Sequence, residues 1–161
     1  LGISESFGEA YYKAQEATQT KLPSEGTVLL SVCDRDKEEL LDIAKSFEKL
    51  DFNILATGKS YEMITEAGIK ADRVNKLYEG RPNITDKIVN GDISLIINTP
   101  AGKTSAHNDS YIRKEAIRHR IPYITTMAAA KASVEGIMAI KSSNQFGVKS
   151  LQDHHEEIEF T

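Results

Sequence analysis

The sequence predicts an α/β domain, a three-layer sandwich of the Rossmann type in which helices cover both faces of a five-stranded parallel sheet. From residue 27 onward, short apolar runs rich in β-branched residues alternate with segments of helical periodicity. One of these runs, 93–99, is apolar on both faces, which is typical of strands buried inside a parallel sheet. The chain has 161 residues, enough for about one domain with its own core.

A helix is expected at the N-terminus, before the alternating part. In the segment 4–19, Ser6 and Glu9 have the spacing of a capping box, and apolar residues recur on one face. The following residues, 21–26, contain proline, serine and glycine and are expected to form a linker.

The first two strands are each expected to lead into a helix. The run 27–32 is apolar and β-branched, and the helix 36–50 that follows has one apolar face and acidic residues at its start. The run 53–57 predicts a second strand, and 60–68 predicts a helix that ends at a glycine.

The middle of the chain continues the pattern. The segment 72–77 predicts a third, weaker strand, and 83–91 predicts a short helix closed by a glycine. The fourth strand, 93–99, is the clearest of the five. It is followed by a helix at 109–120, whose last residues are basic and suit the helix dipole.

The C-terminal part of the chain is expected to form the last strand and the last helix of the alternating pattern. A fifth strand is expected at 122–126 and an alanine-rich helix at 128–142. The tail 143–161 is polar and acidic, and we expect it to be exposed.

Composition and charge exclude several classes of function. The apolar share of 40% and the charged share of 27% are ordinary for a soluble domain, and a net charge of −4 gives no electrostatic reason to expect nucleic-acid binding. No apolar run approaches the roughly 18 residues of a membrane span, and the N-terminus lacks the layout of a signal peptide. Cys33 is the only cysteine, which excludes an internal disulfide and a cysteine-based zinc site and favours a cytoplasmic setting. Because the chain begins at Leu1, we expect a piece of a longer protein.

The stretch ILATGKSYEM, residues 54–63, contains the end of a P-loop motif. The complete motif requires a glycine five positions before Gly58, where this chain has Asn53, and the residues between them are typical of a strand. A nucleoside triphosphate loop is therefore excluded. An anion site remains possible, because a strand that leads into a helix leaves free N–H groups above the sheet.

Small polar side chains follow the strands at the edge where ligands bind in open parallel sheets. They are Ser31, Cys33, Thr57, Gly58, Lys59, Ser60, Asn98, Thr99, Thr125 and Thr126, with Lys37 and Lys76 as candidate cations. Hydroxyl, amide and N–H donors with compensating lysines suit an oxyanion. Helix capping by the same residues is the alternative, and their pattern alone does not decide between the two.

Several segments together resemble a known family. The stretches LLSVCDRDKEEL, LATGKS, VNKLYEGRPNITDKIVNGDISLIINTP and DSYIRKEAIRHRIPYITT closely resemble the C-terminal regulatory domain of the carbamoyl-phosphate synthetase large chain, which has a methylglyoxal-synthase-like fold. The resemblance implies that residues 1–20 end the preceding carbamoyl-phosphate synthesis domain and that 27–142 form the regulatory domain.

The resemblance implies an allosteric nucleotide site with no catalytic residue and no metal. In that family the domain binds UMP and, in many bacteria, IMP as effectors, and ornithine acts near its junction with the neighbouring domain. The residues that match the phosphate contacts are Lys37, Thr57, Gly58, Ser60 and Lys76. Those that match the nucleoside contacts are Ser31, Asn98, Thr99 and Asp109, and Tyr123 and Thr125 match the segment linked to ornithine.

The resemblance also implies the partners of the longer protein. These are the remaining domains of the large chain and a small glutamine amidotransferase subunit, in a synthetase that uses ATP, Mg2+ and K+ and serves arginine and pyrimidine biosynthesis. Two positions depart from the family pattern: Pro100 replaces a frequent threonine, and Lys59 replaces a common glycine.

Methylglyoxal synthases are the enzymatic alternative, because they share the fold and act on dihydroxyacetone phosphate with a carboxylate base. Their GGD loop aligns with Glu79-Gly80-Arg81, which places an arginine where the base is needed. A guanidinium cannot accept the proton at neutral pH, so only the neighbouring Glu79 keeps this alternative open. A purely structural module without a ligand is a third possibility, which the lysines at 37 and 76 disfavour.

Overall fold

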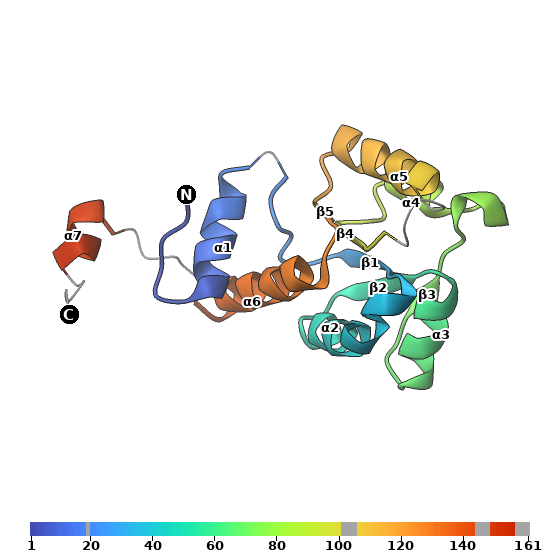
Figure 1. Ribbon diagram of the computed structural model, residues 1–161, viewed down its shortest axis with the longest axis horizontal. Coiled ribbons are helices and arrows are strands. Elements are labelled where there is room, and N and C mark those ends of the chain that lie inside the picture. Colours follow the sequence, from blue (N-terminus) through green and yellow to red (C-terminus); the bar gives the residue numbers. More distant parts are fainter. Residues whose placement is uncertain (19, 101–105, 144–148, 157–161) are drawn as a thin grey trace.

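The computed structural model describes residues 1–18, 20–100, 106–143 and 149–156 (Figure 1). Five strands in this part of the chain form one parallel sheet with the order β3-β2-β1-β4-β5. The strands are β1 (Thr27–Ser31), β2 (Asn53–Ala56), β3 (Asp72–Arg73), β4 (Leu95–Asn98) and β5 (Tyr123–Ile124). The predicted five-stranded parallel sheet is confirmed.

Helices cover both faces of the sheet, so the predicted three layers are confirmed as well. Figure 1 shows α4 and α5 on one side of the strands and α2 and α3 on the other. The described helices are α1 (Phe7–Glu16), α2 (Lys37–Lys49), α3 (Gly58–Glu66), α4 (Ile84–Val89), α5 (Ala106–Arg118), α6 (Met127–Ser143) and α7 (Leu151–Glu156). Two short 3-10 turns, η1 (Asp34–Asp36) and η2 (Leu77–Glu79), follow β1 and β3. None of the described helices has the length and apolar character that a membrane span requires.

Each face of the sheet has its own hydrophobic core. In β1, Val28 and Leu30 belong to the core under α2, α3 and α6, whereas Leu29 belongs to the core under α4 and α5. This alternation follows from the two-residue period of a strand. The larger core includes Phe47, which is fully buried and packs edge-on against Phe52 with 5.3 Å between ring centroids. Removing a buried phenylalanine ring typically costs about 3–5 kcal/mol of stability.

The N-terminal helix α1 packs on α6, and two glycines allow the close approach. A Cβ atom on Gly8 would lie 2.8 Å from the backbone of Glu135, and one on Gly136 would lie 3.0 Å from the carbonyl oxygen of Gly8. The predicted N-cap is confirmed, because the Ser6 hydroxyl accepts a hydrogen bond from the N–H of Glu9 at 3.3 Å. The domain boundary expected at 21–26 stays a prediction.

Some elements differ from their predicted limits. The third strand forms only at Asp72 and Arg73, because it is an exposed edge strand and the chain turns into η2 soon after it. The fifth strand is also shorter than predicted, and the helix after β4 begins at Ala106, not at Asp109. Helix α7 was not predicted. It lies in the tail, at the opposite end of the molecule from η2 in Figure 1, and its described side chains are exposed.

Candidate functional site

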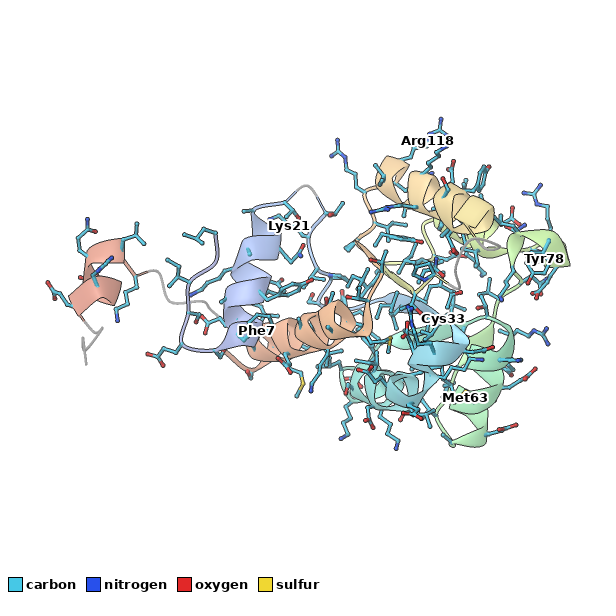
Figure 2. The ribbon with its side chains drawn as sticks, in the orientation of Figure 1. Phe7, Lys21, Cys33, Met63, Tyr78 and Arg118 are labelled. Carbon is cyan, nitrogen blue, oxygen red and sulfur yellow. The ribbon has the colours of Figure 1, made fainter. Side chains whose placement is uncertain are left out.

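A cavity of about 560 Å3 lies at the carboxyl ends of β1, β2 and β4. The structure brings together in its lining all the residues predicted to hold the phosphate and the nucleoside: Ser31, Lys37, Thr57, Gly58, Ser60, Lys76, Asn98, Thr99 and Asp109. Figure 2 labels two further lining residues, Cys33 after β1 and Tyr78 on η2. The structure thus places the nine predicted residues in one cavity, whereas their role in binding a nucleotide stays a prediction.

The N-terminus of α3 faces this cavity. Thr57 precedes the helix, Gly58 is its first residue with a φ of +45°, and the first turn contains no acidic residue. The first N–H groups of a helix have no partner within the helix, and the helix dipole favours an anion there. The Lys76 side chain lies beside this turn, since its Cε is 4.0 Å from where a Cβ of Gly58 would be. A positive charge therefore lies close to these N–H groups.

Several hydroxyl groups of the lining already make internal hydrogen bonds. Thr57 Oγ1 donates to Ser31 Oγ at 3.1 Å, which joins the ends of β2 and β1. Ser60 is buried, and its Oγ accepts from the Val32 N–H at 3.3 Å and donates to the Val32 carbonyl at 3.4 Å. The single hydroxyl proton of Ser60 thus holds α3 against the loop after β1. Ligand binding through that proton would require Ser60 to change partner.

Two lysines form ion pairs with one exposed carboxylate on this side of the cavity. Lys37 Nζ lies 2.6 Å from Asp34 Oδ1, and Lys59 Nζ lies 3.8 Å from Asp34 Oδ2. The hydrogen bond from Lys37 lowers the pKa of Asp34, and the charges of Lys37, Lys59 and Lys76 add to the effect. Asp34 was not among the predicted site residues, although its place just after the first strand points toward this edge.

The opposite wall is held by an amide, a carboxylate and a phenol. Asn98 Nδ2 donates to Asp109 Oδ1 at 3.0 Å and to Tyr123 Oη at 2.6 Å. Burial raises the pKa of Tyr123, and the hydrogen bond from Asn98 partly offsets this. The Arg113 guanidinium lies 5.9 Å from the centre of the Tyr123 ring. Tyr123 and Thr125 do not line the cavity, but Tyr123 contacts its wall through Asn98.

The loop that aligns with the catalytic loop of a methylglyoxal synthase has polar side chains that make contacts within the protein. Glu79 Oε2 accepts a hydrogen bond from the Lys76 N–H at 2.9 Å, which fixes η2. Arg81 is largely exposed, does not line the cavity and forms an ion pair with Asp86. Both polar side chains aligned with the enzyme's catalytic loop therefore have structural partners.

Comparisons with known proteins identify the family of this chain. The model of the MGS-like domain family matches residues 39–125. The C-terminal section of the carbamoyl phosphate synthase large chain of Aquifex aeolicus (strain VF5) is 46% identical over 157 residues, 95% of this chain and 29% of that protein. The large chain of Archaeoglobus fulgidus is 46% identical over 158 residues, 98% of this chain and 15% of that protein. A C-terminal section from Methanopyrus kandleri is 46% identical over 157 residues, 97% of this chain and 29% of that protein.

The similarity extends over nearly the whole chain but over a small part of the relatives. This chain spans less than a third of the length of each of the three proteins above. The family model alone matches more than half of the chain, from the start of α2 to just beyond β5. This chain therefore belongs to the family of MGS-like domains, and the relatives it matches along its length are large chains of carbamoyl phosphate synthase or their C-terminal sections.

Proposed function

We propose that this chain is the allosteric regulatory domain of a carbamoyl-phosphate synthase large chain and binds nucleoside monophosphates, with UMP and IMP as effectors. The names of its relatives and the MGS-like family support this assignment. The observation that carries it is the cavity, where lysines and the N-terminus of α3 lie across from Asn98 and Asp109. Such an arrangement offers positive charge for a phosphate and paired polar groups for a nucleoside.

The phosphate is assigned to the side formed by α3 and the lysines. The N–H groups at the start of α3, including that of Gly58, donate to phosphate oxygens, and Lys37 and Lys76 neutralise their charge. Thr57 holds the loop through its bond to Ser31 and lies beside the same oxygens. Ser60 acts mainly by fixing α3 to the loop after β1.

The nucleoside is assigned to the wall formed by β4 and α5. Asp109 can accept hydrogen bonds from ribose hydroxyls, since a carboxylate has several acceptor positions. Asn98 orients Asp109 by donating to it, and Thr99 completes the wall with its hydroxyl bonded to the Cys33 N–H at 2.9 Å. Ser31 lies between the two sides of the cavity, at the end of β1.

Coupling to the rest of the synthase is assigned to Tyr123 and Thr125, in the segment associated with ornithine. Tyr123 shares the amide of Asn98 with Asp109, so a ligand that moves Asp109 also changes the environment of the Tyr123 hydroxyl. A nucleotide that binds one conformation of the whole protein more tightly shifts the population toward that conformation.

The longer protein is proposed to be the glutamine-hydrolysing, ATP-dependent synthase of arginine and pyrimidine biosynthesis. Its ATP, Mg2+, K+ and small amidotransferase subunit are assigned to regions outside this chain, which spans less than a third of its relatives. The single cysteine favours a reducing compartment such as the cytoplasm.

Calorimetric titration with UMP, IMP and dihydroxyacetone phosphate, together with an assay for methylglyoxal, tests the proposal. We expect saturable binding of a nucleotide at one site and no methylglyoxal. Formation of methylglyoxal from dihydroxyacetone phosphate would overturn the regulatory assignment in favour of a lyase. Arg81 disfavours that outcome because a guanidinium cannot accept a proton at neutral pH, and Glu79, which lines the cavity, already accepts a hydrogen bond from the Lys76 N–H.

A further inference from the structure

The lining of the cavity includes the carboxylate of Asp34, which is already paired with lysines. Asp34 is the first residue of η1, in the segment that follows β1, and its carboxylate lies 2.6 Å from Lys37 Nζ and 3.8 Å from Lys59 Nζ. The two partners differ in exposure: the Lys37 side chain is only 13% exposed, whereas Asp34 is 76% exposed. An exposed carboxylate is thus paired with the ammonium group of a side chain that is itself largely buried.

The position of Asp34 matters because Lys37 is one of the cations assigned to the phosphate. A phosphate that contacts Lys37 must replace the Asp34 carboxylate or share the ammonium with it, and sharing places two anions in contact distance. The hydrogen bond from Lys37 is the largest cause that lowers the pKa of Asp34, and the charges of Lys37, Lys59 and Lys76 add to it. The carboxylate is therefore ionised at neutral pH and competes with its full charge.

We propose that Asp34 is an internal competitor for the phosphate position and so determines which anions can bind. This inference rests on the proposed function, since it takes the cavity to be a phosphate site. A ligand carboxylate exchanges one carboxylate for another and gains little. A phosphate dianion brings a second charge and a third oxygen atom, which reach the other lysines and the N-terminus of α3.

The expected size follows from the charges. Two unit charges about 4 Å apart in a water-like dielectric change an equilibrium constant by roughly fivefold, and a dianion feels about twice that free energy. Asp34→Asn is therefore expected to tighten binding of inorganic phosphate by about five- to twentyfold at low salt. The gain should shrink in high salt, because exposed charges are screened. Binding of acetate should also tighten, but by about fivefold at most, because a monoanion feels half of that electrostatic effect.

The test is an amide-detected NMR titration of the 161-residue chain with inorganic phosphate and with acetate, following Gly58 and its neighbours in α3. Asp42→Asn is the matched control, since Asp42 is an exposed carboxylate on α2 outside the cavity lining and its replacement changes the net charge equally. Dispersion of the amide spectrum verifies that each variant is folded.

The outcomes separate this inference from the proposed function. Tighter phosphate binding by Asp34→Asn, with the control unchanged, supports the internal competitor. Equal or weaker binding by Asp34→Asn, where the unmodified chain binds phosphate, overturns the competitor role and leaves the phosphate site in place. Absence of phosphate binding in every variant overturns the site itself and the competitor with it.

Discussion

Replacing Lys76 by alanine is expected to weaken nucleotide binding without disturbing the fold. Lys76 lies beside the first turn of α3, with its Cε 4.0 Å from where a Cβ of Gly58 would be, and its charge contributes to lowering the pKa of Asp34. In the proposed complex it makes a charge-assisted hydrogen bond to the phosphate. Such a bond contributes about 1.5–3 kcal/mol, and the partial exposure of the side chain favours the lower half of that range. The affinity for UMP should then fall about ten- to fortyfold.

The same variant should change the stability of the domain by less than about 0.5 kcal/mol. The bond that fixes η2 uses the backbone N–H of Lys76, which alanine keeps. Calorimetry gives the affinities and chemical denaturation gives the free energy of unfolding. Lys114→Ala is the matched control, because Lys114 is exposed on α5 and does not line the cavity.

Uridine, which lacks the phosphate, distinguishes a direct phosphate contact from a general effect on the cavity. Lys76→Ala should leave the affinity for uridine unchanged, and Lys76→Arg should retain much of the affinity for UMP. An unchanged affinity for UMP, or an equal loss for UMP and uridine, would refute the assignment of Lys76 to the phosphate.

Three further predictions concern the packing and charge around the site. Thr57→Ala removes the hydrogen bond to Ser31, so it should lower the free energy of unfolding by about 1 kcal/mol and also lower the affinity for UMP. Thr57→Ser keeps a hydroxyl and should keep most of the stability and most of the affinity. Equal behaviour of the two variants would contradict a role for the hydroxyl. Gly136→Val should loosen α1 from α6, because a side chain there meets the carbonyl oxygen of Gly8 at 3.0 Å, and faster amide exchange in α1 with an unchanged sheet would verify this. Asp86→Asn should lower the free energy of unfolding at pH 7, because the hydrogen bond from the Arg81 guanidinium lowers the pKa of Asp86 in the folded chain. A lowered carboxyl pKa stabilises the fold only while the group is ionised, so the difference from the unmodified chain should vanish as the pH falls below about 4. A constant difference in urea denaturation across this pH range would contradict this cause.

The layers and the position of the site could be predicted from the sequence because both depend on local pattern. A strand with apolar residues on both faces, such as β4, must lie inside a covered sheet. Once the strands are parallel, their carboxyl ends share one edge, so Ser31, Thr57 and Asn98 were expected to lie near one another. The cavity lining contains all three.

Other features depend on contacts between distant segments and could not be predicted in this way. The bonds of the Ser60 hydroxyl to Val32 link residues 28 positions apart, and the bond from Asn98 to Tyr123 spans 25. In the sequence, Asp34 has the character of an ordinary turn residue. Its proximity to Lys59 arises because β1 pairs with β2 in the folded sheet. The third strand is shorter than predicted because it lies at the edge of the sheet, where one of its sides has no partner strand.

Amide chemical-shift changes on titration with UMP show directly whether the carboxyl edge of this sheet binds a nucleoside monophosphate. We predict that the largest changes occur at Ser31, Gly58, Lys76 and Asn98, which lie at separate points of the sequence and meet in this cavity. Uridine should reproduce the change at Asn98 and leave Gly58 largely unaffected. Changes confined to other surfaces, or no change at millimolar UMP, would contradict the claim that the carboxyl edge of this sheet binds a nucleoside monophosphate.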